Sequence, residues 1–180
     1  MKYISILRGI NVSGQKKIKM ADLKSLYESL EFENVITYIQ SGNVIFDTQT
    51  QNKQEIITAI ESAIQSTYGF HVPVQIRTMQ EISKLISSIP FNDVNLIENN
   101  TKVLITFLSS QPTKSAIEFL QKYIIEPERL IVNNKHVYLY CPNGYGKSKL
   151  SNTFIEQKLD VSATTRNWKT VCQLEKLTEQ

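Results

Sequence analysis

The order of strand and helix patterns constrains this chain more than any other feature. Short runs rich in β-branched and aromatic residues alternate with stretches in which apolar residues recur every three or four positions. In residues 1–88 the pattern predicts a strand, a helix, two strands, a helix and a strand, followed by one further helix. The predicted strands of this half span residues 2–8, 35–40, 44–47 and 72–77, and its predicted helices span about 20–30, 52–64 and 79–87.

The same order of elements returns in residues 102–180. Strands are predicted at residues 102–108, 130–133, 136–141 and 161–164, and helices at 113–124, 149–159 and 168–177. Between the halves, residues 89–101 lose periodicity and carry Pro90, Asp93 and several asparagines, which is typical of a connection. We therefore predict two domains, at residues 1–88 and 102–180, joined by a linker at 89–101.

A βαββαβ order is that of the ferredoxin-like motif, in which helices cover one face of an antiparallel sheet. The predicted fold class is therefore α+β, a tandem duplication of ferredoxin-like units with antiparallel sheets, each followed by a trailing helix. Because each sheet leaves one face without helices, we expect the two units to cover each other's open faces.

The period of two along a strand assigns side chains to faces. The helix face of the first hairpin is predicted to carry Val35, Ile39, Val44 and Phe46, and the open face of the second Arg129, Ile131, His136, Tyr138 and Tyr140. Tyrosines on an open sheet stack on nucleobases in RNA-binding modules, but they also pack one domain against another. Packing is the favoured interpretation, because no basic-Gly-aromatic-Gly run precedes them.

Composition sets limits on location and chemistry. The chain has 180 residues, 41% of them hydrophobic, and a net charge of +3, which is less basic than a DNA-coating protein requires. It has no apolar run of the roughly 20 residues that a membrane helix needs and no export signal, so we expect a cytoplasmic protein without membrane contact. Neither Cys141 nor Cys172 has metal-site spacing, and no cofactor, metal or catalytic residue is predicted.

Two basic loops lie between a predicted strand and a predicted helix, at residues 8–17 and 144–149. Glycines and helix-start amides favour bound anions, although solvated tight turns explain the same residues. A phosphate-binding P-loop is excluded at the second loop, since Cys141 stands where that motif needs glycine. Downstream, Arg166 is a candidate anion clamp with Trp168 as a stacking surface; alternatively, Thr165 caps a helix and Trp168 is core.

Four motifs resemble the hallmarks of a bacterial family known as domain of unknown function 1697. They are Leu7-Arg8-Gly9-Ile10-Asn11-Val12-Ser13-Gly14, Tyr38-Ile39-Gln40-Ser41-Gly42-Asn43-Val44, Gly144-Tyr145-Gly146-Lys147-Ser148-Lys149-Leu150 and Ala163-Thr164-Thr165-Arg166-Asn167-Trp168. The resemblance implies a two-part ferredoxin-like protein in the bacterial cytoplasm. It implies no activity.

The polar residues of these motifs form our predicted ligand-binding set. They are Arg8, Asn11, Gln40, Asn43, Lys147, Ser148, Lys149, Arg166 and Asn167. One hypothesis places them around a phosphorylated, nucleotide or nucleic-acid ligand in a cleft between the units; another makes them a hydrogen-bond network that locks the units together. An enzyme of acyl or phosphoryl transfer, and a structural or regulatory module that binds a protein through Tyr138 and Tyr140, remain as alternatives. The oligomeric state stays open.

Overall fold

The computed structural model describes residues 1–179 and contains two compact units. The first comprises Met1–Lys84 together with the chain from Leu174 onward, and the second comprises Leu85–Gln173. Residues 89–101, which the sequence predicts to be a linker, therefore belong to the second unit. No helix in the described part of the chain is long and apolar enough to cross a membrane.

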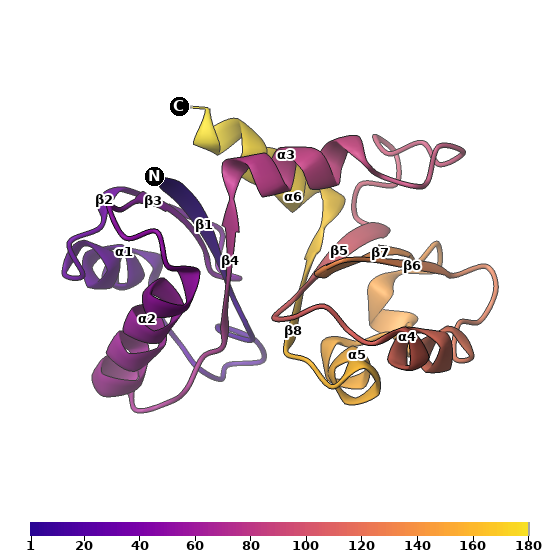
Figure 1. The fold of residues 1–180 in the computed structure, drawn as a ribbon, viewed down its shortest axis with the longest axis horizontal. Helices are drawn as coiled ribbons and strands as arrows, with labels where there is room; N and C mark the ends of the chain where they lie inside the picture. The colour runs from indigo at the N-terminus through magenta and orange to yellow at the C-terminus, as the bar shows by residue number, and fades with distance from the viewer. Residues whose placement is uncertain (180) are drawn as a thin grey trace. The chain divides into compact units, whose positions relative to one another are not determined.

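The first unit is a four-stranded antiparallel sheet with two helices on one face (Figure 1). Its strands are β1 (Lys2–Leu7), β2 (Glu33–Tyr38), β3 (Asn43–Asp47) and β4 (Val74–Thr78), and its helices are α1 (Met20–Glu28) and α2 (Lys53–Tyr68). The order across the sheet is β2-β3-β1-β4. Apolar side chains of β1 and β3 meet those of α1 and α2, such as Leu23 and Ile60, in one buried core.

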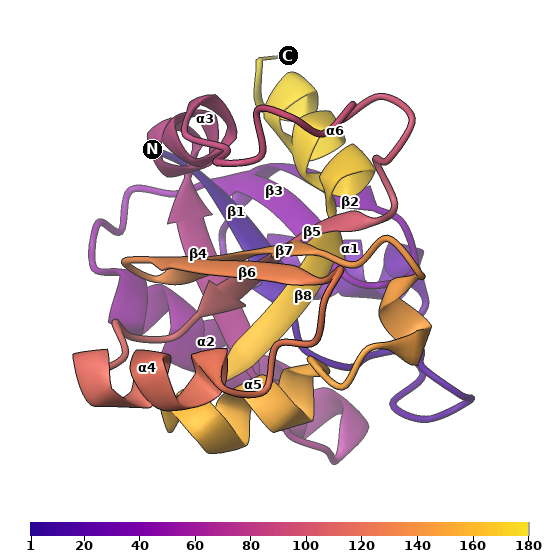
Figure 2. The same ribbon diagram turned by 90° about the vertical axis from the view of Figure 1, so that its right-hand side faces the viewer.

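The second unit has the same architecture, with α4 and α5 beneath its sheet (Figure 2). Its strands are β5 (Val103–Leu108), β6 (Arg129–Asn133), β7 (His136–Tyr140) and β8 (Ala163–Asn167), with α4 (Lys114–Gln121), α5 (Asn152–Leu159) and the short 3-10 turn η1 (Tyr145–Lys147). The order β6-β7-β5-β8 corresponds strand by strand to that of the first unit. The predicted fold class, two ferredoxin-like α+β units with antiparallel sheets, is thus confirmed.

A trailing helix follows each last strand directly, without a loop. These helices are α3 (Met79–Ser87) and α6 (Trp168–Thr178). At the start of α3 Thr78 and Glu81 form a capping box: the Thr78 amide donates to Glu81 Oε2 at 2.7 Å, and the Glu81 amide donates to Thr78 Oγ1 at 3.2 Å. At α6 the Thr170 amide donates to Asn167 Oδ1 at 2.9 Å. Thr165 lies inside β8, so its predicted role as a helix cap is wrong.

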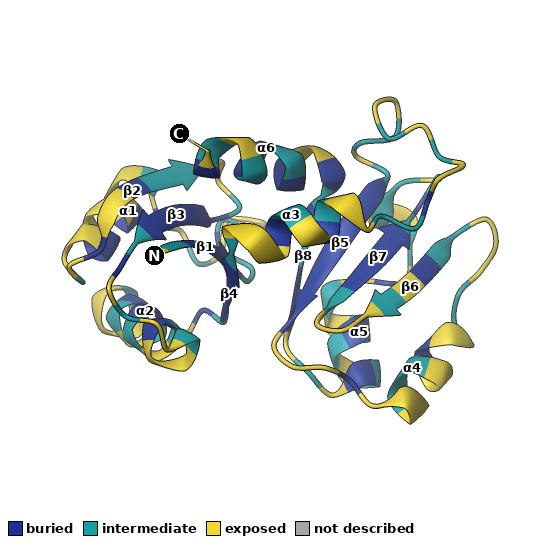
Figure 3. Ribbon diagram, turned by 45° about the horizontal axis from the view of Figure 1, so that its top comes forward, coloured by how far each residue is buried: buried dark blue, intermediate teal, exposed yellow. Residues whose placement is uncertain are grey.

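The strand side chains fall on the faces that their alternation predicts, with one exception. Leu130, Val137 and Leu139 face α4 and α5, as expected, and the strands other than the edge strands β2 and β6 are largely buried (Figure 3). Ile39, however, is 45% exposed and does not join the helix-face core. Its φ of 51° places it in the turn after β2, and this left-handed geometry ends the strand at Tyr38, two residues earlier than predicted.

The capping box yields a first prediction. Thr78→Ala removes the hydroxyl that accepts the Glu81 amide and should lower the free energy of unfolding by about 1 kcal/mol. Thr78→Ser keeps the acceptor and should retain most of that stability, as measured by urea unfolding. Equal losses in the two variants would contradict the capping role.

Glu81 yields a second prediction, on pH dependence. Partial burial acts to raise the pKa of its carboxyl, but hydrogen bonds from Lys53 and the Thr78 amide outweigh it and hold the pKa below its ordinary value. A carboxyl with a lowered folded pKa stabilises the protein above its unfolded pKa, about 4.3, and loses that effect as the pH falls through the folded value. Glu81→Gln should therefore be less stable than the parent at pH 7 in urea unfolding. A gap that did not shrink in acid would refute this assignment.

Candidate functional site

The first basic loop, between β1 and α1, is held closed by one asparagine side chain. The Asn11 amide donates to the carbonyl oxygens of Ile18 and Gln40, each at 2.9 Å, and Asn11 Oδ1 accepts the Ile18 amide at 2.9 Å. The side chain of Asn11 therefore ties the base of the loop to the β2–β3 turn. The hydrogen bonds of the Asn11 side chain thus stabilise the loop and the turn.

The β2–β3 turn is also held by hydrogen bonds from one of its own side chains. Asn43 is fully buried, and its side-chain amide donates to the Tyr38 carbonyl at 3.0 Å and to Ser41 Oγ at 3.2 Å. Gly42, with a φ of 78°, packs so closely on Ile10 that a Cβ there would lie 2.5 Å from Ile10 Cδ1. The motif residues of this unit thus join a loop to a turn.

The second basic loop uses its own backbone amides in a series of tight turns. The amides of Gly144, Lys147 and Ser148 donate to carbonyl oxygens within the loop at 2.9–3.1 Å. The Leu150 amide donates to Ser148 Oγ at 3.0 Å. These amides are consequently not available to cradle an anion.

The helix after this loop begins later than predicted. The chain is extended at Ser148, and α5 starts at Asn152, with Ser151 Oγ accepting the Phe154 amide. The predicted start at Lys149 is wrong, because Ser151 supplies the cap two residues further along. The 144–149 loop therefore does not lead directly into the N-terminus of α5.

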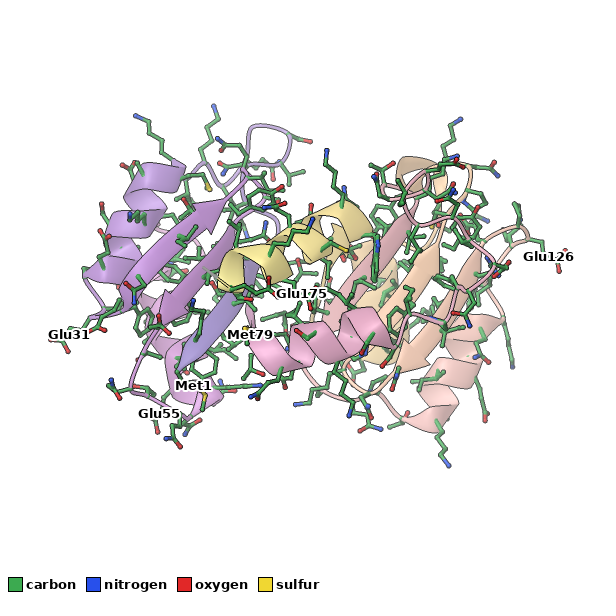
Figure 4. All side chains as sticks on the ribbon, turned by 90° about the horizontal axis from the view of Figure 1, so that it is seen from above. Met1, Glu31, Glu55, Met79, Glu126 and Glu175 are labelled. Carbon is green, nitrogen blue, oxygen red and sulfur yellow. The ribbon has the colours of Figure 1, made fainter. Side chains whose placement is uncertain are left out.

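Two lysines of this loop, Lys147 and Lys149, line a groove of about 560 Å³ within the second unit. Its lining residues are Ile125, Glu126, Pro127, Glu128, Asn143, Lys147 and Lys149. We call it the 125–149 groove. Glu126 projects from the turn before β6 (Figure 4). Among residues 1–179, none of its four charged side chains forms an ion pair within 4.0 Å.

A partly buried hydroxyl network holds the loop against the sheet. Tyr145 donates to Thr165 Oγ1 at 3.4 Å, Thr165 donates to Asn152 Oδ1 at 2.6 Å, and Thr106 Oγ1 lies 2.7 Å from Thr165 Oγ1. Tyr145 and Thr165 come from the third and fourth motifs. Their contact anchors the segment that carries Lys147.

Arg166 lies in β8, is 8% exposed, and donates to Thr164 Oγ1 at 3.3 Å and to the Thr165 carbonyl at 2.9 Å. Burial lowers the pKa of its guanidinium to about 10. Arg77 is the counterpart in β4: Arg77 pairs with Ile4 as Arg166 pairs with Ile105, and both are buried. The repeated pair of an arginine and a helix-capping residue, Arg77-Thr78 and Arg166-Asn167, is a sequence signal from which this equivalence could have been found.

The tyrosines of the second sheet are covered within their own unit. Tyr138 is 1% exposed and donates to the Leu85 carbonyl at 2.9 Å. The Arg129 guanidinium lies 5.1 Å from the centre of the Phe91 ring and 5.0 Å from that of Tyr140, and it pairs with Asp93 at 2.9 Å. Tyr138 is therefore inaccessible to a nucleobase or to a partner protein.

The thiol of Cys141 shows no catalytic arrangement. Burial, together with the charge of Glu128, raises the pKa of the Cys141 thiol to about 11, against a hydrogen bond with Ser148 that lowers it. Cys141 is fully buried, so its thiol is neither ionised at neutral pH nor accessible. Within residues 1–179, no three His, Cys, Asp or Glu side chains are grouped so that they could hold a metal ion.

Of the predicted site residues, Lys147 and Lys149 line the 125–149 groove. Ser148, Arg166 and Asn167 are not among its lining residues, whereas Asn11 and Asn43 have the structural bonds described above. Arg8 is partly exposed, and its amide donates to the Pro73 carbonyl at 2.9 Å. Sequence reasoning missed Glu126, Glu128 and Asn143, because nothing in their spacing links them to the lysines.

Comparisons with known proteins identify relatives of this chain but no activity. A family model described as "Protein of unknown function (DUF1697)" matches residues 1–138, which include the first two motifs but not the 144–150 and 163–168 segments. The chain is similar in structure to the conserved bacterial protein SP0830 from Streptococcus pneumoniae, with a TM-score of 0.77 and 20% identity over 97% of each chain. At that identity the likeness shows the fold alone. A search of curated proteins found no match.

The close approach at Gly42 yields a third prediction. Gly42→Ala and Gly14→Ala both place alanine at a left-handed φ, 78° and 76°, but a Cβ at Gly14 has only Lys17 Cε at 3.9 Å. Gly42→Ala should therefore cost about 1–3 kcal/mol more than Gly14→Ala in urea unfolding, through overpacking against Ile10. Equal costs in the two variants would show that the turn does not depend on this contact.

Proposed function

We propose that this chain, which belongs to the DUF1697 family of proteins of unknown function, binds a small anionic ligand in the 125–149 groove of its second unit. The anion is held by the ammonium groups of Lys147 and Lys149. Asn143, on the same loop, adds an amide that can donate a hydrogen bond to the ligand.

The observation that carries this proposal is the pairing of two exposed lysines in one groove without carboxylate partners among the described residues. Lysine ammonium groups bind phosphate and carboxylate as point charges. Since the loop amides named above donate within the loop, recognition depends on these side chains.

The size of the groove favours a small molecule. A volume of about 560 Å³ lies within the range of small-molecule sites. A nucleic acid would bring a chain of phosphates past Glu126 and Glu128, and it would find Tyr138 buried instead of available for stacking. We therefore favour a small phosphate or carboxylate over a polymer.

Two features of the setting are also proposed. A cytoplasmic bacterial setting agrees with the similarity to a conserved bacterial protein. An ancestral duplication is supported by the matching strand orders and by the equivalent positions of Arg77 and Arg166.

The fourth prediction tests the anion site. Inorganic phosphate titrated into isotope-labelled protein should shift the backbone amide resonances of residues 143–150, followed by two-dimensional NMR. The double variant Lys147→Ala and Lys149→Ala should weaken that binding about tenfold, because it removes two exposed charge contacts.

A matched control is available in the first unit. Lys17 and Lys19 are exposed and have the same two-residue spacing, so Lys17→Ala with Lys19→Ala makes the same change in net charge. This variant should bind phosphate as the parent does. Equal weakening in both variants would mean that phosphate senses only overall charge, and the proposed site would be rejected.

A further inference from the structure

We infer that the natural ligand of the 125–149 groove carries an ammonium group as well as an anionic group. This inference rests on the proposed function and names the ligand class more narrowly: a small zwitterion that joins a phosphate or carboxylate to a primary amine. Glu126 and Glu128 are the residues assigned to the amine.

The charged side chains that line the groove come from two different chain segments. Lys147 and Lys149 come from the loop after β7, and Glu126 and Glu128 come from the turn before β6. That turn is closed by a hydrogen bond of 2.9 Å from the Glu128 amide to the Ile125 carbonyl. The positive and negative side chains thus belong to separate, internally bonded turns.

The balance of charge selects against a simple anion. With two lysines and two glutamates lining it, the groove has a formal charge of zero, so the carboxylates offset part of the attraction that the lysines exert on a plain anion. A ligand with both charges can orient its anion toward the lysines and its amine toward the carboxylates. Specificity then comes from the glutamates, which repel a plain anion, as well as from the lysines, which attract it.

The groove also suits a spacer between the two charges. Ile125 and Pro127 line it beside the glutamates, and Ile125 is 56% exposed. Their apolar surface can cover a short methylene chain. Since no ion pair joins the four charged side chains to one another within 4.0 Å, both sides remain available to a ligand in the described structure.

The test compares ligands that differ only in the amine. Ethyl phosphate and O-phosphoethanolamine form one pair, and propionate and β-alanine form the second, which distinguishes a phosphate ligand from a carboxylate ligand. Binding to the full chain is measured by NMR titration of residues 143–150. In at least one pair, the zwitterion should bind about fivefold more tightly than the plain anion.

Variants assign the preference to the glutamates. Glu126→Gln with Glu128→Gln should remove the preference and tighten binding of the plain anion. Glu31→Gln with Glu33→Gln, two exposed glutamates of the first unit with the same spacing, should preserve the preference. Unchanged far-UV circular dichroism and urea unfolding confirm that each variant is folded.

The outcomes separate this inference from the proposed function. If plain anion and zwitterion bind equally, and both depend on Lys147 and Lys149, the anion site stands and the zwitterion inference is overturned. If no ligand shifts the resonances of residues 143–150, both are overturned. A preference that survives in the Glu126 and Glu128 variant overturns the role of the carboxylates.

Discussion

Each unit is organised around one central strand that is hydrogen-bonded on both sides. β1 pairs with β3 and β4, and β5 pairs with β7 and β8, all antiparallel. Almost every residue of these two strands is buried, which is the condition for near-continuous apolar sequences such as Val103–Leu108. The other strands of each sheet are arranged around this central strand, and the helices pack on the sheet that results.

Side-chain hydrogen bonds hold the loops at the ends of the strands. Leaving a strand exposes backbone polar groups, and side chains such as Asn11, Asn43 and Ser148 satisfy them locally. The glycines at these loops supply left-handed backbone geometry, as at Gly42. The polar residues of the motifs suggest a functional site when only the sequence is known. At these positions, however, most of them form the hydrogen bonds that stabilise the turns. No such structural hydrogen bond is described for the side chains of Lys147 and Lys149, and these are the residues to which we assign anion recognition.

The resemblance to a family and the similarity of fold describe the scaffold and leave its chemistry open. The family model ends at residue 138, before the loop that carries both lysines of the groove. The structural neighbour extends over 97% of the chain at 20% identity, so the scaffold is shared while most side chains differ. A functional hypothesis for this chain must therefore come from its own surface. The mixed charge of the 125–149 groove is the feature of that surface that favours one class of ligand over another.

The sequence by itself determined the element order, the α+β class, the helix-capping box at Thr78 and the faces of the second hairpin, because these follow from local periodicity and local hydrogen bonding. Only the tertiary structure decided the start of α5, the exposure of Ile39 and the burial of Tyr138, since each depends on a backbone angle or on a segment distant in sequence. The 125–149 groove is likewise a feature that only the tertiary structure decided. Its acidic turn and its basic loop are separated by the whole β6–β7 hairpin, and no spacing rule joins them until the sheet brings the ends of the hairpin together.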